Sequence, residues 1–89
     1  QMPSLSTFYG LIIWMYKETD GKHNLPHIHV QYGDYRLVVS LDGQDLEGSI
    51  PRNKRKLLDA WMEIHHDELV ANWTLLSNGE KPAKIEPLK

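Results

Sequence analysis

Residues 27–41 have the sequence HIHVQYGDYRLVVSL, and the alternation of its side chains predicts a β-hairpin. Gly33 and Asp34 stand between the two alternating halves and suit a two-residue turn. Because successive side chains of a strand point to opposite faces, His27 and His29 share one face of the first strand. Aliphatic side chains occupy its other face, so the stretch predicts a sheet with one apolar side.

Strands are also predicted on both sides of this hairpin. Residues 8–17 are rich in aromatic and β-branched side chains, which favours one strand buried on both faces or nearly so. The polar stretch between residues 17 and 26 contains Gly and Pro and is predicted to be a loop. We expect strands at about 8–17, 27–33, 35–42 and 45–50.

From residue 52 to residue 78 the apolar period changes to about 3.6 residues, which is typical of a helix that packs on one side. A single helix of this length is long for so small a domain, so we expect a break near residues 65–67, with Asp67 capping the second half. Asn78 and Gly79 suit a left-handed helix stop. The tail at 83–88 is expected to form at most a short strand.

Together these elements predict one α+β domain over residues 3–89, an antiparallel β-meander of three to four strands packed by a long C-terminal helix or two consecutive helices. The absence of Cys excludes disulfides, thiolate zinc sites and cysteine nucleophiles. No apolar run approaches the ~20 residues of a membrane helix, and no signal peptide is visible. We therefore expect a cytoplasmic protein without membrane contact.

The pair His27 and His29 is the sharpest chemical feature of the sequence. Two histidines at positions i and i+2 of a strand project from the same face, close enough to share a metal ion or a phosphate. Imidazole also titrates near neutral pH, so both residues are candidate catalytic acid or base groups. The alternative is a solvated pair on the polar side of the strand.

A second polar group falls within the apolar line of the helical region. His65 lies in the middle of this line and Glu68 lies close to it, although buried charge is unfavourable unless it is paired. One interpretation is a polar cleft in which these two residues join the histidine pair. The alternative is a solvated helix break. If the aliphatic face of the histidine strand forms the core, His65 cannot meet His29 through the sheet.

Basic side chains concentrate at the expected start of the helical region, where they oppose the helix dipole. These residues are Arg52, Lys54, Arg55 and Lys56. Together with Arg36 on the third expected strand, they are candidate phosphate- or nucleic-acid-binding residues. The net charge of −2 does not exclude such a local patch. A solvated basic run is the alternative.

Motifs over nearly the whole chain carry a family resemblance. They include Phe8-Tyr9-Gly10-Leu11-Ile12-Ile13, Pro26-His27-Ile28-His29-Val30, Leu46-Glu47-Gly48-Ser49-Ile50-Pro51-Arg52, Asn72-Trp73 and Lys84-Ile85-Glu86-Pro87-Leu88. In these motifs the chain resembles the small bacterial domain-of-unknown-function family numbered 4160. Members of that family often sit beside a gene for another small protein, in an arrangement similar to a toxin–antitoxin pair. The resemblance implies a toxin-like protein with a small cognate partner protein. The loop at 19–25 is longer than the family's usual turn, which leaves the position of His23 open.

Three functions are compatible with these features. The first is a toxin-like ribonuclease that uses no metal and no cofactor, in which His29 acts as acid or base, His27 assists and the basic residues hold RNA phosphates. The second is a non-catalytic module that binds its small cognate partner, or a second copy in a homodimer, through a sheet edge or exposed aromatic side chains. The third is a metal site made of His27, His29 and one further ligand. The aromatic candidates for a partner surface are Tyr9, Trp14, Tyr32, Tyr35 and Trp73.

Overall fold

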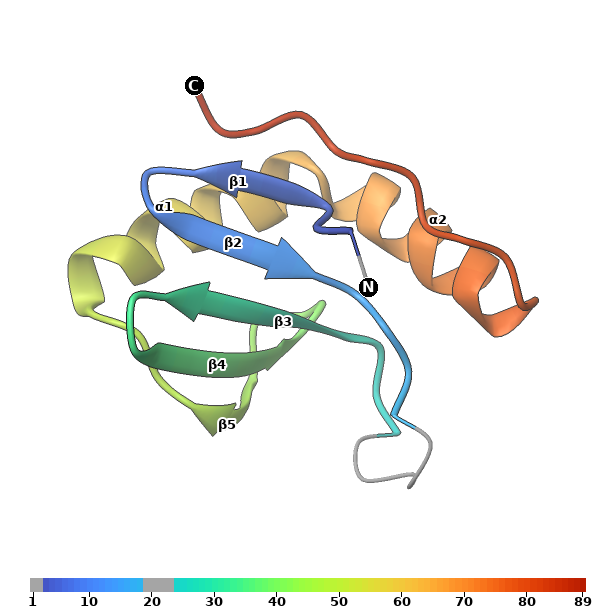
Figure 1. Ribbon diagram of the computed structural model, residues 1–89, viewed down its shortest axis with the longest axis horizontal. Coiled ribbons are helices and arrows are strands. Elements are labelled where there is room, and N and C mark those ends of the chain that lie inside the picture. Colours follow the sequence, from blue (N-terminus) through green and yellow to red (C-terminus); the bar gives the residue numbers. More distant parts are fainter. Residues whose placement is uncertain (1–2, 19–23) are drawn as a thin grey trace.

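The computed structural model describes residues 3–18 and 24–89, so His23 lies outside the described residues. The chain forms a five-stranded antiparallel sheet in the order β1-β2-β3-β4-β5, followed by two helices (Figure 1). The strands are β1 (Ser6–Phe8), β2 (Leu11–Trp14), β3 (His27–Tyr32), β4 (Tyr35–Ser40) and β5 (Asp45–Gly48), and the helices are α1 (Arg52–Ile64) and α2 (His66–Ser77). The α+β meander is confirmed, with one strand more than the upper limit expected.

The single strand expected over residues 8–17 is wrong, because the chain turns within it. Phe8 of β1 pairs with Leu11 of β2. The two residues between them, Tyr9 and Gly10, have positive φ angles of 49° and 83°. Two left-handed residues in a two-residue turn match the twist of antiparallel strands. The aromatic and β-branched composition favours extended structure throughout, and the one glycine of the stretch marks the turn.

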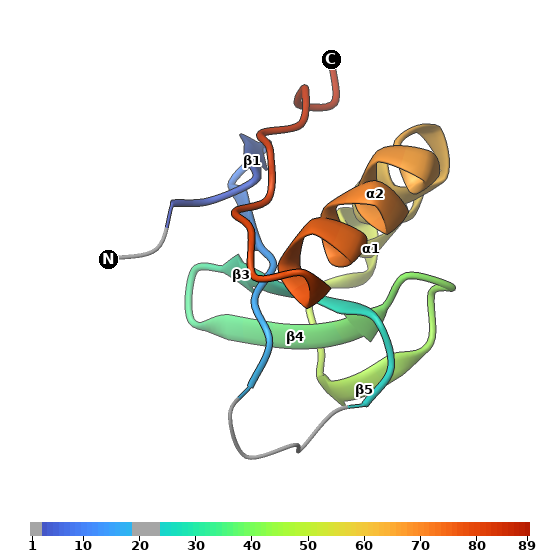
Figure 2. The ribbon, with the colours of Figure 1, turned by 90° about the vertical axis from the view of Figure 1, so that its right-hand side faces the viewer.

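One face of the sheet carries the hydrophobic core. Ile13, Val30 and Leu37 are paired neighbours on β2, β3 and β4, and they belong to one buried cluster with Trp61 of α1 and Leu69 of α2. Both helices lie on this side of the sheet (Figure 2). We call the opposite side the open face. Its central residues are Trp14, Tyr16, His29, Arg36 and Val38.

The helical region breaks where the sequence predicts it. α1 ends at Ile64 and α2 begins at His66, and the N-cap position of α2 is His65. The expectation that Asp67 caps α2 is therefore wrong. Asp67 lies in the first turn of α2, where its negative charge interacts favourably with the helix dipole. Gly79, with φ of 80°, confirms the left-handed stop. Within the described residues, no helix combines the length and the apolarity that crossing a membrane requires.

The C-terminal tail forms no strand but is bound to the domain along its length. The side chain of Asn72 on α2 donates a hydrogen bond to the Ala83 carbonyl oxygen and accepts one from the Ala83 amide, each at 2.8 Å. Trp61 Nε1 donates to the Glu86 carbonyl oxygen at 2.8 Å. The tail thus lies along β1 and α2 (Figure 1). Its main chain supplies the hydrogen-bond partners that the buried Asn72 side chain needs on the apolar side of α2.

Candidate functional site on the open face of the sheet

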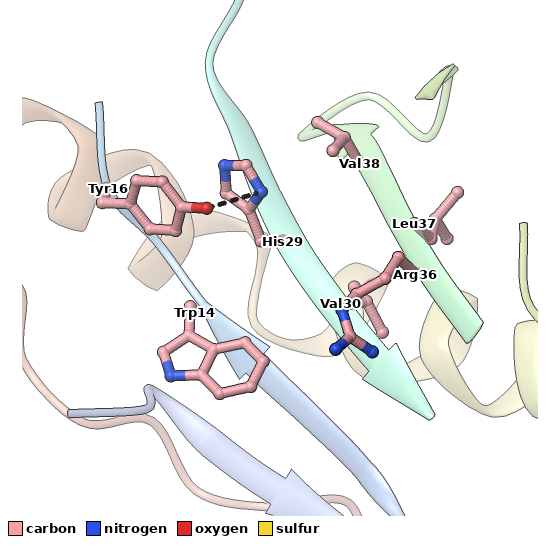
Figure 3. A pocket seen from close by; sticks show the side chains of 7 residues that line it. All are labelled: Trp14, Tyr16, His29, Val30, Arg36, Leu37 and Val38. Atoms are coloured by element: carbon pink, nitrogen blue, oxygen red, sulfur yellow. Dashed lines mark hydrogen bonds between the residues drawn. The ribbon is translucent and has the colours of Figure 1, made fainter. Parts of the chain in front are cut away.

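A pocket lies on the open face over β2, β3 and β4 (Figure 3). Strand pairing builds it, because Trp14 pairs with His29 and His29 pairs with Val38, which sets the three side chains in a row. Tyr16 and Arg36 stand two residues away along their own chain segments and so share the face. Figure 3 shows the Arg36 side chain extending over β3 toward Trp14.

His27 is completely buried at the end of this face. Its Nδ1 lies 2.7 Å from the Leu25 carbonyl oxygen, and Nδ1 carries a proton because a carbonyl oxygen only accepts. Its Nε2 lies 2.8 Å from Oε1 of Glu18. The ring packs beside Trp73 of α2, with ring centroids 5.2 Å apart. Both nitrogens of the buried imidazole therefore have hydrogen-bond partners, which offsets the loss of solvation.

His29 lines the pocket and is held by its neighbours on the open face. Its ring stacks on that of Tyr16, with centroids 4.0 Å apart and an interplanar angle of 7°. Its Nδ1 lies 3.2 Å from the Tyr16 hydroxyl, and its Nε2 lies 3.7 Å from Oε2 of Glu18. Burial, and then the negative charge of Glu18, raise the pKa of the Tyr16 phenol above its ordinary value. The phenol therefore keeps its proton at neutral pH.

Glu18 is the residue that sequence reasoning missed. Its two carboxylate oxygens face Nε2 of His27 and Nε2 of His29, and one ligand atom from each of the three residues lies within 4.8 Å of the others. The signal was present in the alternation Trp14, Tyr16, Glu18, which continues the open-face line of β2 into the following segment. Because the residues after 17 were predicted to be a polar loop, Glu18 was not recognised as a continuation of this alternation.

The candidate phosphate-binding residues do not gather on one face. Arg36 lines the pocket on the open face, whereas the other four belong to α1 on the core side of the sheet. Lys54 donates a hydrogen bond to the Tyr9 carbonyl oxygen at 3.2 Å. Arg52 and Lys56 are exposed on α1. The structure thus brings only Arg36 to the histidine site.

Arg55 is held within the domain by two carboxylates. Its Nε donates to Asp59 at 2.9 Å, its Nη1 donates to Asp45, and its Nη2 donates to the Gly43 carbonyl oxygen at 2.8 Å. Burial lowers the pKa of the guanidinium, but the hydrogen bonds and charges of Asp59 and Asp45 outweigh it and leave the pKa above its ordinary value. Arg55 therefore ties α1 to the turn before β5.

His65 and Glu68 form a separate pair at the junction of α1 and α2. His65 Nδ1 lies 2.5 Å from Oε1 of Glu68, and the His65 ring packs on Trp61 with centroids 5.6 Å apart. The aliphatic residues of β3 face the core. This is the arrangement in which His65 is not expected to reach His29 through the sheet.

Comparison with known proteins adds one family assignment. No curated protein and no solved structure matches the chain. The model of one family, described as "Domain of unknown function (DUF4160)", matches residues 10–74, a stretch that includes β2 to β5 and most of both helices. Glu18, His27, His29 and Arg36 all lie within the matched stretch. Since the match covers well over half of the sequence, the chain belongs to this family of domains of unknown function.

Proposed function

We propose that this protein is a toxin-like RNA-acting protein of the bacterial cytoplasm, and that its open face binds and cleaves single-stranded RNA. The observation that supports this proposal is that Arg36 and His29 line one pocket together with Trp14. A guanidinium recognises phosphate, and an aromatic ring on a sheet face offers a surface on which a base can stack. The pocket therefore combines the contacts for a backbone and a base with a titratable imidazole.

Proton transfer in this site runs through the pair Tyr16 and His29. Tyr16 lines the pocket, and its hydroxyl contacts Nδ1 of His29 at 3.2 Å. In the proposed step the RNA 2′-hydroxyl gives its proton to Tyr16, which passes its own to Nδ1. The 2′-oxygen bonds to phosphorus, the bond from phosphorus to the 5′-oxygen breaks, and water protonates the leaving 5′-oxygen. The hydroxide that remains takes the proton from Nδ1, which restores the site. The products are a 2′,3′-cyclic phosphate and a 5′-hydroxyl.

His27 has a different part in this proposal from the assisting acid or base expected from the sequence. Its ring is fully buried and does not line the pocket. It holds Glu18, whose second oxygen lies beside His29. His27 is therefore a positioning residue.

The test is cleavage of a single-stranded RNA by purified wild-type protein, His29→Ala and Tyr16→Phe, with His66→Ala as the control on α2. We expect His29→Ala to lose about 10²–10⁴-fold in rate, as for loss of an acid or base group. His66→Ala should match the wild type, because His66 lies on α2 rather than on the open face. Cleavage at the wild-type rate by folded His29→Ala would overturn the assignment.

The toxin-like part of the proposal is tested in cells. Induced expression of the wild type should arrest bacterial growth with fragmented RNA, and His29→Ala should not. Co-expression of the small protein encoded by the neighbouring gene should restore growth. Normal growth during wild-type expression, with intact RNA, would contradict the toxin-like role.

A second candidate function is the non-catalytic module that binds the small cognate protein. It is favoured by the exposure of Tyr9 (54%), in the turn between β1 and β2, and of Tyr35 (50%), which follows the turn between β3 and β4 at the same end of the sheet. Tyr35 lies beside Tyr32, with ring centroids 6.4 Å apart. The measurement is the affinity of the neighbouring gene's product for wild type, Tyr35→Ala and Tyr9→Ala. Unchanged affinity in both variants would remove this surface from consideration.

A further inference from the structure

We infer that Glu18, His27 and His29 form a binding site for a divalent transition-metal ion of the zinc class. Two imidazoles and one carboxylate converge, with one ligand atom from each within 4.8 Å of the others. This inference goes beyond the proposed function and does not rest on it, because the site lies in the sheet whether or not the open face binds RNA.

The hydrogen bonds of the two rings orient both Nε2 atoms toward one point. Metal-binding histidines typically use the far ring nitrogen for an outer hydrogen bond, which sets the tautomer and the ring orientation. His27 Nδ1 donates to the Leu25 carbonyl oxygen at 2.7 Å. His29 Nδ1 contacts the Tyr16 hydroxyl at 3.2 Å. Each ring therefore presents Nε2 to the Glu18 carboxylate.

The ligand atoms lie close to the spacing of a small-ion site, and a shift of the side chains would complete it. Zinc binds histidine nitrogen and carboxylate oxygen at about 2.0–2.2 Å, so two ligand atoms of a tetrahedral site are about 3.4 Å apart. Glu18 Oε1 lies 2.8 Å from Nε2 of His27, and Glu18 Oε2 lies 3.7 Å from Nε2 of His29. These two oxygen–nitrogen separations, one to each carboxylate oxygen, lie on either side of the tetrahedral value. The three ligand atoms lie within 4.8 Å of one another, so binding an ion brings them closer by at most about 1.4 Å. Without metal, a shared proton forms the hydrogen bond between His27 and Glu18, and a bound ion would replace that proton.

The ligand types select the kind of ion. Imidazole nitrogen suits Zn²⁺, Fe²⁺, Ni²⁺ and Cu²⁺, whereas Mg²⁺ and Ca²⁺ prefer sites made only of oxygen ligands. Two histidines with one carboxylate are also the protein ligands of known catalytic zinc sites, in which the fourth position holds water or substrate. His29 lines the pocket, so a ligand in the pocket would lie next to the ion.

The test uses tag-free protein that has been stripped with a chelator and titrated with Zn²⁺ by calorimetry and with Co²⁺ by absorption spectroscopy. We expect one ion per chain, a Co²⁺ spectrum typical of tetrahedral nitrogen and oxygen ligation, and no binding of Mg²⁺. Glu18→Gln and His29→Ala should each lower Zn²⁺ affinity at least tenfold. Tyr16→Phe, which removes only the outer hydrogen bond, should lower it about 10–100-fold. His66→Ala is the matched control and should bind as the wild type does.

Two results would overturn the site. One is the absence of saturable binding at one Zn²⁺ per chain in the wild type. The other is wild-type affinity in Glu18→Gln and His29→Ala, shown to be folded by circular dichroism. Should the variants fail to fold, X-ray absorption of the zinc-loaded wild type decides, because a spectrum without scattering from two histidine rings contradicts the assignment. Zinc binding and RNA cleavage are measured separately, so the absence of zinc binding would contradict the metal site without contradicting the proposed RNA cleavage, and the reverse also holds.

Discussion

Nε2 of His27 lies 2.8 Å from a carboxylate oxygen of Glu18, a residue of the segment that leaves β2. The other oxygen of the same carboxylate lies 3.7 Å from Nε2 of His29. A single acid therefore connects both histidines of β3 to the segment after β2. The stability of this end of the sheet and the proposed chemistry of its open face therefore involve the same three side chains.

The substitution His27→Ala should destabilise the protein. It removes a fully buried ring that contacts Trp73 and leaves both the Leu25 carbonyl and the Glu18 carboxylate without that partner. We expect a loss of about 2–4 kcal/mol in the free energy of unfolding, measured by urea denaturation. His66→Ala on α2 should stay within about 0.5 kcal/mol of the wild type. An equal loss in the free energy of unfolding for the two substitutions would show that the contacts of His27 do not stabilise the protein.

Among the glycines that the structure describes, Gly48 should be the least tolerant of substitution. It has φ of 76°, and a Cβ built on it would lie 2.1 Å from the Arg36 carbonyl oxygen, which is main chain and accepts a hydrogen bond from the Ser49 amide. We expect Gly48→Ala to lower the free energy of unfolding by about 3 kcal/mol or more, since a clash adds to the strained φ. Gly43→Ala is the control, because φ is 93° there but nothing lies within 4 Å. It should cost about 1–2 kcal/mol, and a similar loss at both sites would contradict the steric argument.

Asn72→Ala should release the C-terminal tail. The substitution removes two 2.8 Å hydrogen bonds to the Ala83 main chain from a buried position. We expect a loss of about 1–3 kcal/mol in the free energy of unfolding, together with faster trypsin cleavage after Lys84. Thr74→Ala, at an exposed position of the same helix, is the control. Unchanged cleavage in Asn72→Ala would mean that other contacts hold the tail.

The α+β fold was predictable because the spacing of apolar residues along the sequence distinguishes strands from helices. Alternation over 27–41 and the 3.6-residue period after residue 52 identify the hairpin and the helical region. The turn at Tyr9 and Gly10 was missed because local composition favours extended structure, whereas the turn is set by the pairing of Phe8 with Leu11.

The candidate site was predictable only in part. The i, i+2 spacing places His27 and His29 on one face of a strand, and this follows from the pleat alone. The contact of both histidines with Glu18 depends on the register between β2 and β3, in which Trp14 pairs with His29. The alternation of side chains in a single sequence predicts which residues share a face of a strand, but it does not give the register of that strand with its neighbour. The separation of Arg36 from the cations of α1 depends on which face of the sheet α1 covers, a contact between elements far apart in the sequence.

Arg36→Ala should weaken RNA binding to the open face. Arg36 is exposed at the pocket, and its guanidinium makes two long contacts of 3.4 Å, with the Gly33 and Tyr35 carbonyl oxygens. We expect weaker binding of a single-stranded oligonucleotide and a salt dependence of the affinity that falls by about 0.7 in log–log slope, the value for one phosphate contact. Arg52→Ala on α1 is the matched control, because it removes the same charge from the other side of the sheet. Equal losses in the two variants would indicate binding by net charge rather than by the pocket.

Zinc should inhibit RNA cleavage by this protein if both proposals hold. An ion bound at Nε2 of His29 leaves Nδ1 as the protonated nitrogen of that ring, and Nδ1 then donates to the Tyr16 hydroxyl instead of accepting from it. Proton transfer from RNA through Tyr16 is thereby blocked. We expect the cleavage rate to fall in proportion to zinc occupancy and to recover on chelation, whereas Glu18→Gln should need at least tenfold more zinc for the same inhibition. Cleavage that rises with zinc occupancy would instead make the ion part of the reaction, and the proton path through His29 and Tyr16 would have to be abandoned.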